Sequence, residues 1–235
     1  MNRSGWCFDE MRHAGVDYSD PSLVARYDER HQNFRDYRRD AEAVVSLMGL
    51  QARHSVVDMG CGTGAFALNA APLVKTVYAV DVSAAMLEYC RRRAAERNLG
   101  NVVFRQGGFL SYEHDADPVD AVVSTAALHH LPDFWKCIGL RRVHRLLKPG
   151  GKFYLFDIVF PGSEADLRPP IEAWIEFMRR KAGDEFAAEA ETHIRDEFST
   201  YDWILEGLLT RAGFRIDRIS RGEGFGAAYL CVRNS

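Results

Sequence analysis

The chain has 235 residues, 47% of them hydrophobic, and its formal net charge at pH 7 is −3. A chain of this length can bury one substantial core, so we expect a single domain over residues 1–235. The slightly acidic charge balance provides no broad basic surface, which argues against a nucleic-acid partner.

The sequence contains five cysteines and no C-x-x-C pair, so neither a zinc site nor a disulfide framework is expected. The first ten residues lack the apolar core of a signal peptide, and no apolar run approaches the roughly 18 residues of a membrane span. We therefore expect a cytoplasmic protein with reduced thiols, no bound metal and no membrane association.

The first predicted strand, residues 56–58, ends in Asp58 and leads into a turn with a glycine at every second position, namely Gly60, Gly62 and Gly64. Glycine carries no Cβ, so a ligand can lie directly against the main chain there. A helix is predicted over about residues 65–73, and its positive end suits a carboxylate or a phosphate. The spacing G-x-G-x-G differs from the dinucleotide pattern G-x-G-x-x-G. Asp58, two residues before Gly60, would repel a phosphate and attract an ammonium group.

A second strand, residues 76–81, ends in Asp81, 23 residues after Asp58. A carboxylate at the end of this strand can accept hydrogen bonds from both hydroxyls of a ribose. S-adenosylmethionine is a ligand with an amino-acid end and a ribose end, and the two acids together indicate this cofactor.

Strands are further predicted at residues 102–105, 121–124 and 152–160, with helix-length patterns between them. This alternation is typical of a parallel sheet covered by helices on both faces. Two short strands, 215–220 and 227–232, follow near the C-terminus and are joined by a glycine-rich stretch, which indicates an antiparallel pair.

Four stretches in this order resemble motifs of the class I S-adenosylmethionine-dependent methyltransferases of the small-molecule, ubiquinone/menaquinone methyltransferase-like type: residues 56–66, 80–87, 119–133 and 146–152. The resemblance covers roughly residues 44–159. It implies an α/β fold with a Rossmann-like, doubly wound sheet of seven strands, mostly parallel, with one antiparallel strand near the edge and helices on both faces. It also implies methyl transfer from S-adenosylmethionine to a small-molecule acceptor at O, N, S or C. The cofactor-binding residues that it implies are Asp58, Gly60, Cys61, Gly62, Gly64, Asp81, Val82, Met86, Gly108, Phe109 and Ser124.

One position departs from the family pattern. Relatives commonly place an acidic or amide residue after the third strand to meet the adenine amino group, and this chain has Gly108 there. Either Gln106 or a backbone group meets the adenine edge, with Phe109 against the ring, or the cofactor binds less tightly than in relatives.

Two segments outside the shared core are expected to select the acceptor. Relatives often fold a helical segment over the cofactor, and residues 16–50 are the matching lid, with Tyr27, Phe34, Arg35 and Tyr37 as candidate substrate contacts. Residues 161–199 are an insertion after the fifth strand and form a predicted substrate cap, with Trp174, His193 and Arg195 as candidates.

The insertion contains a helical pattern entered through Pro169-Pro170, with apolar residues at Ile171, Trp174, Ile175 and Met178. This stripe is either a packed face or a wall of the substrate site. If residues 191–197 are extended, alternation puts His193 and Arg195 on one side. Arg195 then either clamps an anionic substrate group or pairs with Asp196 or Glu197, and Arg35 has the same ambiguity beside Asp36. Residues 199–202 resemble a capping box for a helix over 201–211.

Methyl transfer from a sulfonium needs little acid or base catalysis, because the leaving group departs neutral. The protein mainly aligns nucleophile, methyl and sulfur in line and excludes water. His129, after the fourth strand, is the candidate general base; alternatively, His129 and His130 are scaffold residues without a chemical role. The stretch Ser124-Thr125-Ala126-Ala127 lacks the Asn/Asp-Pro-Pro-Tyr-like signature of relatives that methylate base amines or glutamine amides.

Two other functions share parts of this pattern. An NAD-dependent oxidoreductase also has a glycine loop and a ribose-binding acid, although the glycine spacing and Asp58 argue against it. A non-catalytic S-adenosylmethionine-binding partner protein is the other alternative, and Gly108 favours it.

Overall fold

The computed structural model describes residues 5–12, 14, 15, 24, 36–163, 165–222 and 224–234. The predicted lid, residues 16–50, therefore lies largely outside the described residues, as do the candidates Tyr27, Phe34 and Arg35.

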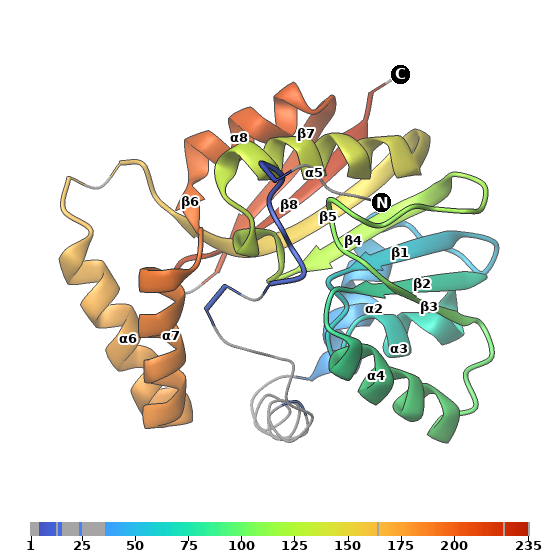
Figure 1. Ribbon diagram of the computed structural model, residues 1–235, viewed down its shortest axis with the longest axis horizontal. Coiled ribbons are helices and arrows are strands. Elements are labelled where there is room, and N and C mark those ends of the chain that lie inside the picture. Colours follow the sequence, from blue (N-terminus) through green and yellow to red (C-terminus); the bar gives the residue numbers. More distant parts are fainter. Residues whose placement is uncertain are drawn as a thin grey trace.

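One mixed sheet forms the centre of the fold, with the strand order β3-β2-β1-β4-β5-β8-β7 (Figure 1). A two-residue strand, β6, pairs with the end of β5 and was not predicted. Among the described strands, β8 alone runs in the opposite direction to the others, and it pairs antiparallel with both β5 and β7. The predicted fold, seven mostly parallel strands with one antiparallel strand near the edge, is therefore confirmed. The strands are β1 (Ser55–Met59), β2 (Thr76–Asp81), β3 (Val102–Gln106), β4 (Val119–Thr125), β5 (Leu147–Phe160), β6 (Thr200–Tyr201), β7 (Phe214–Arg221) and β8 (Gly226–Arg233).

The two faces of the sheet are buried by different helices. Successive residues of a strand point to opposite faces, so Val56 belongs to one core cluster and Val57 to the other. The Val56 face is covered by α2 (Tyr37–Met48), α3 (Ala67–Ala70) and α4 (Ala84–Glu96), and the Val57 face by α5 (Asp133–Leu146) and α8 (Asp202–Arg211). This arrangement is the expected doubly wound architecture.

The chain order and the spatial order of the strands differ at one point. From β1 the chain winds outward through β2 to β3, then returns to place β4 on the other side of β1. Ligands of open α/β sheets bind at the carboxyl ends of the strands beside such a reversal. The gap between the carboxyl ends of β1 and β4 is therefore where the site is expected.

Two helices lie beyond this edge of the sheet. α6 (Arg168–Ala182) and α7 (Asp184–Asp196) pack against each other and project from the rest of the fold (Figure 1). α6 begins with Pro169 and Pro170, whose missing N–H groups cost nothing in a first helical turn. The predicted helix in the insertion is thus confirmed.

Three local predictions are wrong. The predicted helix over 65–73 is shorter, because residues 62–66 form turns and Pro72 lies in a 3₁₀ turn, η1 (Ala71–Leu73), after α3. Residues 191–197 are not extended, since α7, rich in Ala and Glu, continues to Asp196. There is no capping box at 199–202, because the N-cap of α8 is Tyr201 and makes no side-chain cap bond.

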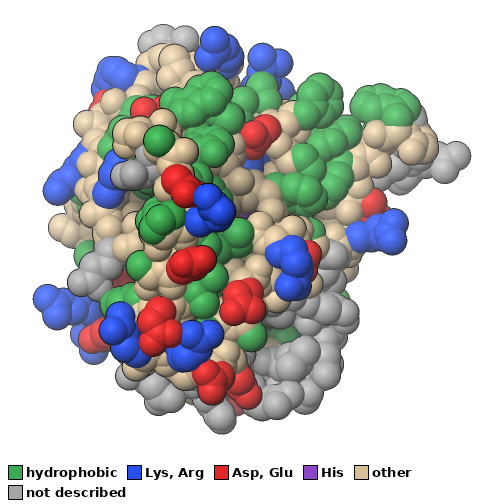
Figure 2. All heavy atoms as spheres, turned by 90° about the vertical axis from the view of Figure 1, so that its left-hand side faces the viewer, with side chains coloured by type: hydrophobic (Ala, Val, Ile, Leu, Met, Phe, Trp, Pro, Cys, Tyr) green, Lys and Arg blue, Asp and Glu red, His purple; other side chains and the backbone are tan. Residues whose placement is uncertain are grey.

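The face that carries α6 and α7 shows acidic and basic side chains interspersed, with hydrophobic side chains among them (Figure 2). A nucleic-acid-binding face is expected to be continuously basic, and this face is not. Within the part of the chain that is described, no helix has the length and apolar character needed to cross a bilayer.

Candidate functional site

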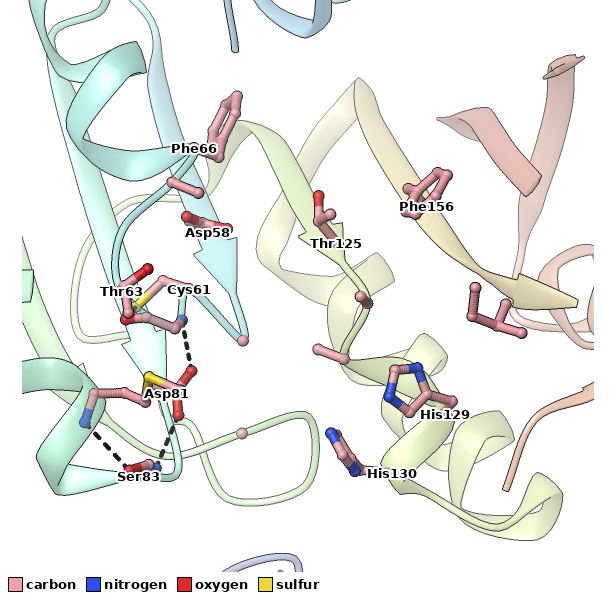
Figure 3. A pocket seen from close by; sticks show the side chains of 18 of the residues that line it. Asp58, Cys61, Thr63, Phe66, Asp81, Ser83, Thr125, His129, His130 and Phe156 are labelled. Atoms are coloured by element: carbon pink, nitrogen blue, oxygen red, sulfur yellow. Dashed lines mark hydrogen bonds between the residues drawn. The ribbon is translucent and has the colours of Figure 1, made fainter. Parts of the chain in front are cut away.

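A cavity of about 680 Å³ opens at the carboxyl ends of β1, β2, β4 and β5 (Figure 3). One half of it, here called the cofactor half, is lined by the glycine turn after β1 and by the end of β2. The other half, here called the acceptor half, is lined by the segment after β4, the end of β5, and the helices α6 and α7. The two halves form one continuous space.

Hydrogen bonds join the glycine turn to the last two residues of β2. The N–H groups of Gly60 and Cys61 donate to the carbonyl of Val80, at 2.8 and 3.0 Å. The N–H of Gly62 donates to Oδ2 of Asp81 at 2.8 Å, and the Ser83 N–H donates to Oδ1 at 2.8 Å (Figure 3). Asp81 also lines the cavity, and an ionised carboxylate acts only as a hydrogen-bond acceptor. Asp81 thus both holds the turn and offers acceptor atoms to the cavity.

The glycines of the turn have different structural tasks. Gly60, Gly62 and Gly64 all have positive φ, at 75°, 53° and 89°. A Cβ at Gly60 would overlap the Cβ of Ala127, and one at Gly64 would lie 2.5 Å from Sγ of Cys90. A Cβ at Gly62 would meet no atom within 4 Å, because it would point into open space. Gly62 is therefore the position where a ligand can approach the main chain.

Asp58 lines the cavity, although only 2% of its surface is exposed. Its Oδ2 accepts a hydrogen bond from the N–H of Ala67 at 3.1 Å, which ties β1 to the start of α3. Burial, partly offset by this hydrogen bond, raises the pKa of Asp58 to about 7. A cation beside Asp58 would stabilise the charged form of this carboxyl group.

Glu10 reaches the cofactor half from the N-terminal segment. Its side chain is buried, and both carboxylate oxygens accept from the N–H of Leu110, at 3.0 and 2.9 Å. A Cβ built at Gly108 would lie 2.7 Å from Oε2 of Glu10. The glycine at 108 is therefore the space that the Glu10 carboxylate occupies. One feature of the sequence, the missing acid at residue 108, indicated an unusual contact here, but nothing in the sequence indicated that Glu10 makes it.

The acceptor half contains a cluster of imidazoles and carboxylates. Nδ1 of His129 lies 2.5 Å from Oδ1 of Asp157, and its Nε2 lies 3.3 Å from Oε2 of Glu197. His193 forms an ion pair with the same oxygen of Glu197 through Nδ1, and its Nε2 lies 2.7 Å from Oγ of Ser199. Of these residues, Asp157 and Glu197 had not been predicted to lie in the site. They come from β5 and from the residue after α7, far from His129 in sequence.

The charge states in the cluster follow from its surroundings. Burial acts to lower the pKa of His129, but the charges of Asp157 and Glu197 outweigh it and raise the pKa. Burial acts to raise the pKa of Glu197, yet the hydrogen bond from His193 and the nearby imidazoles lower it. At His130, burial and the neighbouring His129 outweigh the charges of Glu197 and Asp157 and lower the pKa to about 4.

Most predicted site residues that are described line the cavity: Asp58, Gly60, Cys61, Gly62, Asp81, Val82, Met86, Gly108, Phe109, His129, Tyr37, Trp174 and His193. Three do not. Gly64 packs against Leu68 and Cys90, and Ser124 is fully buried within β4, where strand alternation turns the neighbouring Thr125 toward the cavity. The side chain of Arg195 is 66% exposed and bonds Asp196 through two nitrogens, so the pairing alternative holds for Arg195.

The comparisons with known proteins agree with this geometry. A methyltransferase domain model matches residues 56–151. The uncharacterized methyltransferase GK2543 of Geobacillus kaustophilus is 32% identical over 191 residues, which is 81% of this chain and 81% of the relative. These matches do not favour an NAD-dependent oxidoreductase or a non-catalytic partner protein.

Solved structures of low identity share the fold. An S-adenosylmethionine-dependent methyltransferase from Aquifex aeolicus has a TM-score of 0.62 at 20% identity, covering 91% of this chain and 98% of the other. One from Clostridium acetobutylicum has a TM-score of 0.67 at 12% identity, with the same coverage. The strand order, the glycine turn between two strand-end acids and the 32% identical relative lead to one conclusion: the chain belongs to the class I S-adenosylmethionine-dependent methyltransferases.

Proposed function

We propose that the enzyme transfers the methyl group of S-adenosylmethionine to a small-molecule acceptor held in the acceptor half of the cavity. The observation that carries this proposal is the single cavity with two chemically different halves. Its volume of about 680 Å³ lies within the range of small-molecule sites. The acceptor half is walled by apolar and aromatic residues with a few polar groups, namely Phe156, Ile158, Trp174, Met178, Phe186, His129 and His193.

In the cofactor half, we assign the amino-acid end of the cofactor to the glycine turn and Asp58, and the ribose to Asp81. The open side of Gly62 supports close approach of the ligand to the main chain. The place of the Asp81 carboxylate in the cavity wall, at the end of β2, supports acceptance of the ribose hydroxyls, because an ionised carboxylate only accepts hydrogen bonds. Val82, Met86, Gly108 and Phe109 line the cavity beyond Asp81, and we assign the adenine to them.

Binding of the ammonium group near Asp58 predicts a pH-dependent affinity. Since the pKa of Asp58 is about 7, the carboxyl group is protonated in the free enzyme at lower pH and must lose its proton to pair with a cation. The dissociation constant for S-adenosylhomocysteine should therefore rise as pH falls below 7, by up to about tenfold per pH unit. Titrations between pH 5.5 and 8 measure this slope. The Asp58→Asn variant should bind more weakly but with a flat profile, and equal slopes in both proteins would remove Asp58 from the site.

We further propose that Glu10 recognises the adenine amino group. The carboxylate lies beside Gly108, at the position where relatives commonly carry an acidic or amide side chain on residue 108 itself. A buried carboxylate without a strong donor is costly, and within the described residues the N–H of Leu110 is the one donor found for the Glu10 carboxylate, so most of its acceptor sites remain for a ligand. An exocyclic amine supplies the missing donor.

A test of Glu10 compares two ligands that differ only at the purine 6-position. S-adenosylhomocysteine has an amino group there, and S-inosylhomocysteine has an oxygen that a carboxylate repels. The wild-type enzyme should prefer the adenine ligand by at least about tenfold, since a site built to accept a donor is left unpaired by the analogue. Glu10→Gln should lose most of this preference, because an amide can face either group. Asp9→Asn, which changes the neighbouring exposed carboxylate, should keep it. If Glu10→Gln discriminates as well as the wild type, Glu10 does not read the adenine.

The transfer step requires alignment of the reacting atoms and a group that accepts one proton. A lone pair of the acceptor atom forms a bond to the methyl carbon as the carbon–sulfur bond breaks. The bonding pair remains on sulfur, and the sulfonium becomes the neutral thioether of S-adenosylhomocysteine. We propose His129 as the base that takes the proton of the acceptor on Nε2. Asp157 supports this role because it holds Nδ1 and so directs Nε2 into the cavity.

The acceptor class can be tested without knowing the acceptor. A bacterial extract is separated into nucleic-acid, protein and small-molecule fractions, and each is incubated with the enzyme and methyl-labelled S-adenosylmethionine. The proposal expects label in the small-molecule fraction alone. Label in the protein or nucleic-acid fraction would contradict it. The ubiquinone/menaquinone likeness of the sequence stays a prediction, as does the cap role of residues 161–199.

A further inference from the structure

We propose that His129, His130 and Glu197 form a binding site for one divalent transition-metal ion, such as Zn²⁺, in the acceptor half of the cavity. Nothing in the family match assigns such a site. The inference rests on the proposed function in one respect only, namely that the ion would bind the methyl acceptor. Binding of the ion itself can be measured independently.

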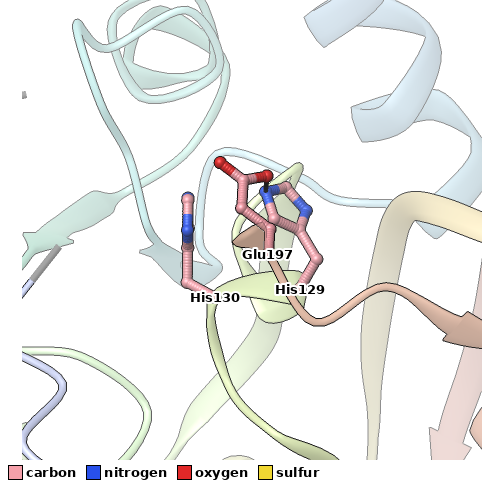
Figure 4. A group of neighbouring side chains, drawn as sticks. All are labelled: His129, His130 and Glu197. Atoms are coloured by element: carbon pink, nitrogen blue, oxygen red, sulfur yellow. Dashed lines mark ion pairs between the residues drawn. The ribbon is translucent and has the colours of Figure 1, made fainter. Parts of the chain in front are cut away.

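The geometry of the three side chains carries the proposal. The two histidines sit on η2 (Leu128–His130), and Glu197 approaches from the end of α7, so its carboxylate lies near both imidazoles (Figure 4). One ligand atom from each residue lies within 4.8 Å of the others. Nε2 of His129 and Oε2 of Glu197 are 3.3 Å apart, which is close to the spacing of about 3.4 Å for two ligands held tetrahedrally at about 2.1 Å. Small side-chain rotations of His130 would complete the set.

His129 already has the outer contact that a metal-bound histidine usually has. Its Nδ1 pairs with the buried carboxylate of Asp157, which fixes the ring and leaves Nε2 toward Glu197. A carboxylate behind a ligating imidazole sets its tautomer and makes it a better ligand. Asp157 is itself held by the N–H groups of His129 and Ile158.

Charge and hydrogen bonding at the cluster also fit an ion. With neutral imidazoles, the two negative charges of Asp157 and Glu197 exceed the one positive charge of the nearby buried Lys136, and a bound cation would balance the excess. No hydrogen bond of the His130 imidazole is found within the described residues, although the ring lies in the cavity wall, 4.4 Å from that of His129 between centroids. Coordination to an ion would give an imidazole nitrogen of His130 a partner.

The donor set selects the kind of ion and ligand. Two imidazoles and one carboxylate suit Zn²⁺, Mn²⁺, Fe²⁺ or Co²⁺, whereas Mg²⁺ and Ca²⁺ prefer oxygen alone. Three protein ligands leave a position open toward the cavity, as in catalytic rather than structural zinc sites. An oxygen of the acceptor can fill that position, which points to an acceptor with a hydroxyl or carboxylate near the methylated atom. Nε2 of His129 cannot hold an ion and a proton at once, so the base role proposed for His129 belongs to the enzyme without the ion.

The experiment uses tag-free, chelator-treated full-length enzyme, with Zn²⁺ followed by calorimetry and Co²⁺ by its visible absorption. The wild type should bind one ion per chain with micromolar affinity, and Co²⁺ should give absorption bands of a low-coordinate nitrogen and oxygen site. Asp157→Asn should weaken binding by about 10- to 100-fold, and Glu197→Gln and His129→Gln should weaken it more. His54→Gln removes an imidazole from the loop before β1, at the opposite edge of the sheet, and should bind as the wild type does.

Titration of the same samples with S-adenosylhomocysteine shows whether each variant is folded and tests the proposed function separately. An enzyme that binds S-adenosylhomocysteine but shows no saturable ion binding would overturn the metal site alone. Equal affinity of Glu197→Gln and His54→Gln would also overturn it. A thiolate-to-cobalt band would place the ion on a cysteine, and would contradict the proposed ligands.

Discussion

Asp81→Ala should weaken the binding of S-adenosylhomocysteine by about 1.5–3 kcal/mol, the usual value of hydrogen bonds to a charged group. Two losses combine in this variant. The ribose hydroxyls lose their acceptor, and the N–H of Gly62 loses the carboxylate oxygen that holds it at 2.8 Å. The glycine turn is then less firmly held in the conformation that admits the ligand. Calorimetric titration of the variant measures the effect.

Asp120→Ala is the matched control for this substitution. Asp120 also accepts a backbone hydrogen bond, from the N–H of Ser55 at 2.9 Å, but it lies at the amino end of β4, beside the start of β1, and outside the cavity. Its removal should lower the melting temperature without changing the dissociation constant. Unchanged affinity in Asp81→Ala, or an equal loss in Asp120→Ala, would refute the ribose assignment.

Gly62→Val should abolish saturable binding of S-adenosylhomocysteine while the protein still folds. The valine side chain would enter the open space above the turn, where no protein atom lies within 4 Å of a Cβ, and would occupy the place of the ligand. The positive φ of 53° adds backbone strain of about 1–3 kcal/mol, which a domain of this size can tolerate. Calorimetry gives the affinity, and circular dichroism confirms the fold.

Gly150→Val separates the steric effect from the strain. Gly150 has a similar φ of 74° and equally open surroundings, but it lies near the amino end of strand β5. This variant should lose comparable stability and keep normal cofactor affinity. A folded Gly62→Val that binds like the wild type would remove the glycine turn from the site.

The parts of the fold that sequence could predict are those determined by local patterns. The strand over 76–81 was predicted with its observed bounds, because an apolar run ending in Asp81 is bounded by turn residues. The glycine turn was predicted for the same reason, since its spacing is local. β6 could not be found, because two residues carry no pattern and form a strand only through pairing with β5.

The site was predictable on its cofactor side and much less so on its acceptor side. Ser124 was predicted as a cofactor contact, but the sequence of a strand buried on both faces does not show which face meets the cavity. Arg195 was placed on a substrate-facing side by assuming an extended tract, and the helix turned it to solvent. Glu10 and Glu197 act through contacts 100 and 68 residues distant, with Leu110 and His129, and such contacts arise only from the tertiary fold.

A crystal structure of the enzyme with S-adenosylhomocysteine tests the central claim most directly. We expect the ribose hydroxyls on Asp81, the adenine amino group beside Glu10, and the amino-acid end at the glycine turn. The sulfur should then face the acceptor half, with an unobstructed path from it toward His129. A cofactor bound in the reverse orientation, or with its sulfur turned away from the His129 cluster, would contradict this account.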